Sequence, residues 1–219
     1  MHYLDRASVP EPQCLQAFSH TTHIWDDVGS QCKTAIRESL RAMQGPRCAY
    51  CEASVEFSDR HIEHFRRKGG NGQFRNLTFD WSNLFLSCDG PRHCGHYKDN
   101  PRTGPGPYSP SDLVKPDVEE PDNFLYFYSN GRVEPRSGTL EAIAKRANET
   151  IRVFNLDAGQ LRHPRERAVA KYIAHLDRDR AELATWSDAD RRAYFDSEIA
   201  ETADRPFATA IRHYLERLK

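Results

Sequence analysis

The chain has 219 residues, of which 38% are hydrophobic and 29% charged, and its formal net charge is -1 at pH 7. A chain of this length can bury one sizeable core, alone or with a small appended unit. The near-neutral charge excludes a global basic field for holding nucleic acid, so such binding would need local patches or a partner. No stretch approaches the roughly 18 apolar residues of a membrane span, and we expect no membrane partner.

The roles expected for the six cysteines depend on the cellular compartment, because the compartment decides whether disulfides form. Residues 1–12 include Asp5, Glu11 and two prolines but no apolar run, so they lack the pattern of a secretory signal. We therefore expect a cytoplasmic protein, in which cysteines serve as metal ligands or free thiols rather than disulfides. Cys14 and Cys32 lie in helix-like sequence and are predicted to be core thiols.

The first third of the chain predicts one helix followed by short strands. Apolar residues from Trp25 to Met43 recur at spacings of three and four, which is typical of a helix, and Gly45-Pro46 should end it. Residues 48–66 are strand-like and predict a hairpin. Its apolar positions are Val55, Phe57, Ile62 and Phe65. A glycine-rich basic loop, residues 66–72, follows.

The remaining sequence predicts an irregular segment, a hairpin and helices. Six prolines between 100 and 121 favour irregular structure, and residues 124–133 predict a β-hairpin with an Asn130-Gly131 turn. Three amphipathic helical stretches follow: Thr139 to Phe154, Arg162 to Leu183, and Asp188 to Leu218 with an interruption at Pro206. The fold class is therefore α+β and mostly helical. We divide the chain into an N-terminal helical region (1–46), a core (47–100), a Pro-rich loop with a hairpin (101–138) and a C-terminal helical region (139–219).

Four cysteines predict a structural zinc site. Cys48-x-x-Cys51 suits a tight turn, and Cys88 and Cys94 follow roughly forty residues later, a two-plus-two arrangement that fits tetrahedral zinc-thiolate coordination. Five residues rather than two separate the second pair, which leaves His93 as an alternative ligand. The competing interpretation is four buried free thiols.

Between the cysteine pairs lies His61-Ile-Glu63-His64-Phe65, a set of side chains suited to phosphodiester hydrolysis. That reaction needs a base for the attacking water and a divalent ion to neutralise charge on the phosphate. Neutral His64 suits the base, and Glu63 with one further ligand suits Mg²⁺. Strand alternation would place His64 on the face opposite His61 and Glu63, unless the strand bends at Phe65.

These residues carry a resemblance to a known family. The segments that carry it are Cys48-x-x-Cys51, His61-Ile-Glu63-His64-Phe65-Arg66-Arg67-Lys68, Asp80-Trp81-Ser82-Asn83-Leu84, Cys88 and Cys94-x-x-x-Lys98. They resemble the HNH endonuclease motif, and more closely the HNH proteins of Septu-type and retron-associated anti-phage systems, known as PtuB. The resemblance implies a ββα-metal core with a zinc knuckle, between an N-terminal helix and a C-terminal helical region.

The resemblance also implies roles for individual residues. Glu63 would bind the catalytic metal, His64 would be the general base, and Asn83 would hydrogen-bond the loop that orients it. Lys98 would brace the helix or contact phosphate.

One position departs from the family pattern. In many HNH proteins an Asn or His follows the last knuckle cysteine and binds the metal, whereas this chain has Gly95 there and His96 one place later. His96 is one candidate for the missing ligand. His61, on the same strand face as Glu63, is the other.

The predicted function is a metal-dependent HNH endonuclease that cuts DNA or tRNA. It would use structural Zn²⁺ and catalytic Mg²⁺ or Mn²⁺, and Arg66, Arg67 and Lys68 would contact phosphate, although a basic run is usually solvated surface. The resemblance implies an anti-phage setting with a PtuA-like ATPase partner, for which segment 100–121 and the C-terminal helices are candidate docking surfaces. The alternative is a zinc-knuckle module that binds nucleic acid or protein without cutting.

Overall fold

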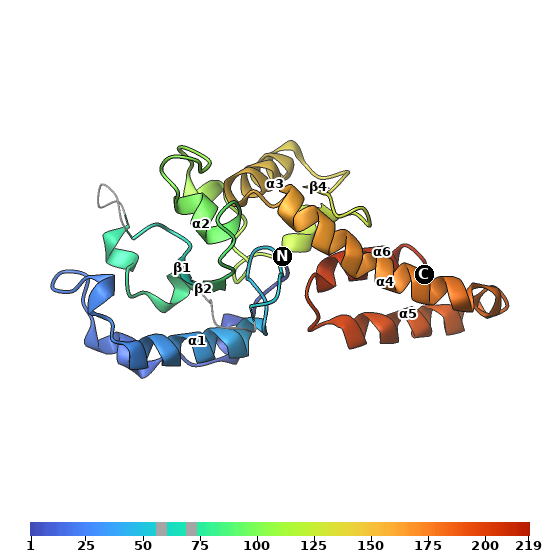
Figure 1. The fold of residues 1–219 in the computed structure, drawn as a ribbon, viewed down its shortest axis with the longest axis horizontal. Coiled ribbons are helices and arrows are strands. Elements are labelled where there is room, and N and C mark those ends of the chain that lie inside the picture. The colour runs from blue at the N-terminus through green and yellow to red at the C-terminus, as the bar shows by residue number, and fades with distance from the viewer. Residues whose placement is uncertain (56–60, 69–73) are drawn as a thin grey trace.

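The computed structural model describes residues 1–55, 61–68 and 74–219, and combines helices with two small sheets (Figure 1). The α-helices are α1 (Ser30–Gln44), α2 (Cys94–Asp99), α3 (Glu141–Phe154), α4 (Gly159–Leu183), α5 (Asp188–Thr202) and α6 (Ala208–Glu216). The strands are β1 (His61–His64), β2 (Leu84–Ser87), β3 (Leu125–Phe127) and β4 (Val133–Pro135). Short 3-10 helices cover Arg6–Ser8, Gln13–Ala17, Trp25–Asp27, Arg75–Leu77, Trp81–Asn83, Pro110–Asp112 and Pro121–Asn123. The fold is thus mainly helical, as predicted.

The N-terminal helix is shorter than its apolar spacing predicts. Trp25–Asp27 forms a separate 3-10 turn, in which the Asp27 side chain accepts a hydrogen bond from the Ile24 N–H. Helix α1 begins only at Ser30, after Gly29, and ends before Gly45, whose φ is +69°. The predicted end is confirmed, and the predicted start is wrong because the Asp27 cap closes a turn of its own.

The hairpin predicted within residues 48–66 is wrong. Strand β1 pairs antiparallel with β2, with His61 opposite Ser87 and Glu63 opposite Phe85. Residues 47–54 contribute a single bridge, Arg47 to Ser54. Phe57 and the glycines of loop 66–72 lie outside the described residues. The pairing is long-range, and local patterns of alternation do not encode a partner strand twenty residues away.

Cys14 and Cys32 form a disulfide, with their Cα atoms 5.8 Å apart. This overturns the prediction of two core thiols. The bond ties the 3-10 helix Gln13–Ala17 to α1, two elements that pack together only in the folded chain. The sequence prediction assumed a reducing compartment and contained no information on that proximity.

The C-terminal half matches the sequence predictions closely. Strands β3 and β4 form the expected hairpin around Asn130-Gly131, where Gly131 has φ +79° and donates to the Tyr128 carbonyl. Segment 101–121 contains turns and 3-10 helices but neither α-helix nor strand. The last helical stretch is interrupted near Pro206, as expected, which separates α5 from α6. Helices α4, α5 and α6 extend as an arm to one side of the molecule (Figure 1).

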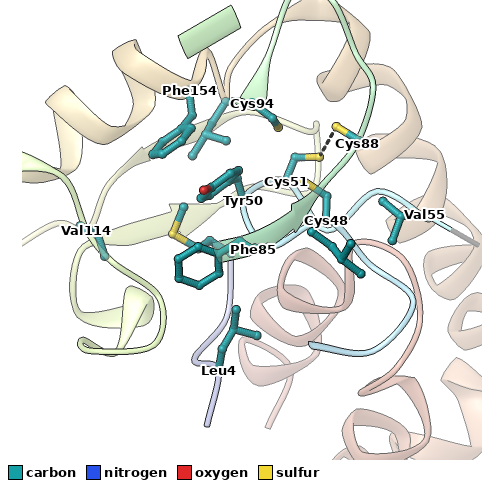
Figure 2. Packing of buried hydrophobic residues seen from close by; sticks show 14 of the residues in the cluster. Leu4, Cys48, Tyr50, Cys51, Val55, Phe85, Cys88, Cys94, Val114 and Phe154 are labelled. Carbon is teal, nitrogen blue, oxygen red and sulfur yellow. Dashed lines mark hydrogen bonds between the residues drawn. The ribbon is translucent and has the colours of Figure 1, made fainter. Parts of the chain in front are cut away.

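The main core surrounds β2 and fixes the surroundings of the cysteines. Leu84, Phe85 and Leu86 are fully buried, and Tyr50 stacks on Phe154 of α3 with ring centroids 4.1 Å apart. Figure 2 shows this packing beside the cysteines. Within the described residues, no helix has both the length and the apolar character to cross a bilayer.

Candidate metal-dependent active site

Four buried cysteines from three segments converge at one point. Cys48 and Cys51 lie in a tight turn, in which the Glu52 N–H donates to the Cys48 carbonyl. Cys88 follows β2 and Cys94 begins α2. Their Sγ atoms all lie within 4.8 Å of one another, and Figure 2 shows the four side chains gathered beside Tyr50 and Phe85. The predicted two-plus-two set is therefore assembled.

The set fits a tetrahedral zinc ion. With Zn–S bonds of about 2.3 Å, the edge of such a tetrahedron is about 3.8 Å, and the Cys51 and Cys88 Sγ atoms are 3.7 Å apart. Burial and hydrogen bonds with the neighbouring cysteines raise the pKa of Cys94. A divalent cation would compensate the charge of four buried thiolates, which repel one another without it.

His93 borders the cysteine set without replacing a member. Its Nδ1 lies 3.5 Å from Cys88 Sγ and 3.4 Å from Cys94 Sγ. Since all four sulfur atoms already converge, the geometry favours the Cys₄ set over the alternative with His93.

A cavity of about 350 Å³ opens beside this cluster, between β1 and α2. Its lining includes His61, Glu63, His64, Lys68 and His96. His64 reaches the same cavity as Glu63 because β1 ends there and the chain bends, with the Phe65 N–H donating to the Asn83 carbonyl. Of the two arrangements considered for the strand, the structure has the bend at Phe65.

Glu63 is fully buried and ionised. Its Oε1 lies 2.7 Å from Lys98 Nζ, and its Oε2 accepts a hydrogen bond from His61 Nε2 at 3.1 Å. Burial raises the pKa of Glu63, but the Lys98 charge and the His61 hydrogen bond outweigh it and lower the pKa to about 2. Oε2 is thus the oxygen directed to the cavity as an anionic ligand.

Gly95 makes room for this carboxylate. A Cβ atom at position 95 would lie 2.3 Å from Glu63 Oε2. Position 95 has glycine where the HNH pattern has Asn or His. The observed place of the Glu63 carboxylate requires that glycine. A side chain at position 95 cannot serve as a metal ligand while Glu63 occupies this place.

Lys98 has no exposed surface, which argues against the predicted phosphate contact. Its ammonium is 2.7 Å from Glu63 Oε1 and 2.6 Å from Asp99 Oδ1, and it donates to the His64 carbonyl at 3.0 Å. Burial lowers the pKa of Lys98, but the two carboxylates together raise it above its usual value. Its contacts favour the other predicted role, in which it braces α2 against β1.

His64 is oriented with Nε2 toward a backbone carbonyl, which leaves Nδ1 as the ring nitrogen that can accept a proton. Its Nε2 lies 2.9 Å from the Thr78 carbonyl oxygen, which can only accept, so Nε2 carries the hydrogen. Burial and the Lys68 charge lower the pKa of His64 to about 3, and the neutral imidazole is the form present near pH 7. Trp25 packs edge-on against this ring, with centroids 4.5 Å apart.

Asn83 connects the two segments that hold His64. Its Nδ2 donates to the carbonyls of Arg66 and Leu77 at 2.9 and 3.1 Å, and its Oδ1 accepts from the Arg66 N–H at 2.8 Å. Leu77 precedes Thr78 in the same turn. Asn83 therefore ties the end of β1 to the turn whose carbonyl orients the imidazole.

His61 is better placed than His96 to share an ion with Glu63. Cis ligands of an octahedral ion with bonds of about 2.1 Å are about 3.0 Å apart, and His61 Nε2 and Glu63 Oε2 are separated by 3.1 Å. His96 stacks on the His61 ring, and its Nε2 bonds to Asp89 Oδ1 at 3.1 Å. In the described parts of the chain, only the four cysteines form a group of three or more ligand atoms as compact as 4.8 Å.

The three predicted phosphate contacts separate in the structure. Lys68 lines the cavity. Arg67 pairs with Asp99 at 2.7 Å and lies over Tyr108, and Arg66 lies over Phe74 in a neighbouring hollow. Only Lys68 of this set therefore faces the cavity beside His64.

Thr78, Trp25 and Asp99 take part in the site without having been selected from the sequence. Thr78 acts through its backbone carbonyl, which leaves no signal in residue type. Trp25 falls on the apolar face of the predicted helix. Asp99, which directly follows Lys98, could have been found as a partner for it.

Comparisons with known proteins agree with part of this interpretation. No family model matches the chain. The protein named "Retron Vc95 putative HNH endonuclease" from Vibrio cholerae serotype O1 biovar El Tor is 36% identical over 56 residues. The match covers 26% of this chain and 27% of the length of that relative. Part of the chain is thus similar to a protein named as an HNH nuclease.

We predict about one zinc ion per chain, bound by the four cysteines. Because thiolate coordination of zinc contributes folding free energy, Cys48→Ser or Cys88→Ser should lose the zinc and unfold at a lower temperature. Elemental analysis and thermal denaturation measure the two effects. A wild-type protein that is fully folded without metal would contradict the prediction.

A second prediction concerns the buried pair of Glu63 and Lys98. Lys98→Met should destabilise the protein by about 3–5 kcal/mol, because it leaves a buried carboxylate without its cation. The double variant Glu63→Gln/Lys98→Met should be more stable than Lys98→Met alone. Urea denaturation of the zinc-loaded proteins provides the free energies of unfolding. Additive losses in the double variant would mean that the two residues are not coupled.

Proposed function

We propose that this chain is a divalent-metal-dependent endonuclease of the HNH type. In this proposal β1, β2 and α2 form the ββα-metal core, and the Cys₄ zinc site holds that core together. The observation that carries the proposal is the convergence of Glu63, His61 and His64 on one cavity. The partial similarity to a protein named as an HNH endonuclease supports it.

His61 Nε2 and Glu63 Oε2 would hold the catalytic Mg²⁺ or Mn²⁺. The bound ion would neutralise charge on the scissile phosphate and on the leaving oxygen. Lys98 occupies the other carboxylate oxygen, which leaves Oε2 for the cavity. Glu63 is ionised near pH 7 and needs no proton loss to act as a ligand.

His64 would deprotonate the attacking water. Its Nδ1 accepts the proton, because Nε2–H is committed to the Thr78 carbonyl. That hydrogen bond also stabilises the imidazolium that forms, since the carbonyl dipole faces the positive ring. Asn83 positions the turn, and Lys68 would pair with a phosphate oxygen in the cavity.

Four variants test the catalytic assignments. His64→Ala should lower cleavage below detection, and Glu63→Gln should lower it by about two to four orders of magnitude. His61→Ala should cost more activity than His96→Ala, because His61 shares the presumed ion with Glu63. Cleavage of duplex DNA and of a tRNA pool is measured with and without Mg²⁺ or Mn²⁺.

Zinc content and thermal stability of each variant serve as controls. If His64→Ala keeps both and cleaves like the wild type, His64 is not the base. If the wild type cleaves neither substrate with either ion, both alone and together with a PtuA-like ATPase, the non-catalytic zinc-knuckle module becomes the better interpretation.

We further propose that the nuclease is the effector of an anti-phage system of the Septu or retron type, related to PtuB, and acts with a PtuA-like ATPase. The net charge of -1 supports a need for a partner, because the isolated chain has little long-range attraction to nucleic acid. The α4–α6 arm extends away from β1 and α2, which border the catalytic cavity (Figure 1), whereas the irregular segment 101–121 begins at the cavity, where Pro101 and Arg102 belong to the lining.

Co-expression with a PtuA-like ATPase from the same genome tests this association. We expect the two proteins to co-elute in size-exclusion chromatography, and we expect nucleic acid cleavage to depend on the complex. Separate elution together with strong cleavage by the isolated chain would support a stand-alone nuclease instead.

A further inference from the structure

Two lysines from distant parts of the chain meet at one aromatic ring beside His64. Lys33 lies in α1 and Lys68 follows β1, yet their Nζ atoms lie 5.9 and 5.8 Å from the centroid of the Trp25 ring. The same ring contacts His64 edge-on at 4.5 Å. The fold therefore places two cations around the residue that packs on the proposed base.

Neither ammonium is neutralised by the described part of the chain. Both side chains are half-buried, and no carboxylate oxygen of a described residue lies within 4.0 Å of either Nζ. Cation–π contacts near the 6 Å limit are weak and leave the N–H donors of an ammonium unused. The two groups thus keep their charge and their capacity to donate hydrogen bonds.

Trp25 is a fixed support for these lysines. Its indole stacks with Phe79 at 6.3 Å, and Phe79 in turn stacks on Phe18 at 5.3 Å. Long lysine side chains lie along such apolar surfaces while their ammonium groups remain in solvent. Lys68 also lines the cavity that His64 lines.

Each Nζ lies within 6 Å of the same ring centroid, so the two charges are no more than about 12 Å apart, and an anion placed between them would be attracted by both. Beside the proposed base of a phosphodiesterase, the matching anion is a phosphate group of the substrate backbone. Lysines bind phosphate as point charges and do not recognise nucleobases, so the contact would be independent of the nucleic acid sequence.

We propose that Lys33 and Lys68, supported by Trp25, form one binding subsite for a phosphate of the substrate backbone. This phosphate would lie beside His64, the proposed base for hydrolysis. The inference rests on the proposed nuclease function and adds Lys33, in the N-terminal helix, to the residues that hold the substrate. It assigns α1 a part in substrate binding.

The salt dependence of DNA binding tests the subsite. A fluorescein-labelled DNA duplex is titrated with the full chain by fluorescence anisotropy, at several NaCl concentrations and without added Mg²⁺ or Mn²⁺. Loss of one phosphate contact reduces the slope of log Kd against log salt by about 0.9 on a duplex. We expect a smaller reduction for Lys33→Gln and for Lys68→Gln, because the remaining lysine still contacts the shared phosphate, and the full reduction of about 0.9 in the double variant.

Two further variants make the result specific. Lys171→Gln in α4 removes the same charge from another lysine that has no ion pair among the described residues, and it should keep the wild-type slope. Lys33→Arg keeps the charge and should restore the slope, which separates loss of charge from damage to the fold.

An unchanged slope in Lys33→Gln, or an equal reduction in Lys171→Gln, would overturn the subsite while leaving the nuclease proposal intact. Single variants that each lose the full slope of about 0.9, with a double variant that loses about twice as much, would show two separate phosphate contacts and overturn the shared one. A wild-type chain that binds no DNA, and no tRNA in the same assay, would instead count against the proposed function.

Discussion

The convergence of four cysteine thiols is the interaction on which the candidate site depends. It joins the turn at Cys48 and Cys51, the end of β2 at Cys88 and the first residue of α2 at Cys94. Helix α2 has six residues, too few to persist alone in water. Its position must therefore come from its attachment at Cys94 and from its packing against β1 and α3.

The electrostatics of the cavity follow from that attachment. Because α2 begins at Cys94, Gly95 lies against the Glu63 carboxylate, and Lys98 reaches the same carboxylate one turn later. A buried carboxylate would otherwise take up a proton, and the Lys98 charge keeps it ionised. Each oxygen of the Glu63 carboxylate has its own partner: Oε1 contacts Lys98, and Oε2 accepts a hydrogen bond from His61. The Lys98 contact that compensates the buried charge of Glu63 thus leaves Oε2 for the cavity.

The proposed base, unlike Glu63, is oriented by a backbone group. His64 is oriented by the Thr78 carbonyl, and Asn83 holds the backbone on both sides of it. Such contacts make the imidazole direction insensitive to side-chain motion at the surface. They also explain why the loop between β1 and β2, although long, keeps its two ends in register.

Sequence alone determined the elements whose causes are local. The helices from 139 onward, the Asn130-Gly131 turn and the end of α1 at Gly45 follow from apolar periodicity and from residues with special backbone preferences. The cysteine spacing also indicated the zinc-ligand set, because two of its members lie in one tight turn. These features depend on residues that are neighbours along the chain.

Only the tertiary structure decided which distant residues meet. It paired β1 with β2 rather than within 48–66, bonded Cys14 to Cys32, and buried Lys98, for which phosphate contact had been one prediction. It also favoured His61 over His96 beside Glu63 and brought Lys33 to Trp25. The physical reason is the same in each case: the free energy of these contacts depends on separations and burial that arise only when the whole chain packs. No local pattern encodes them.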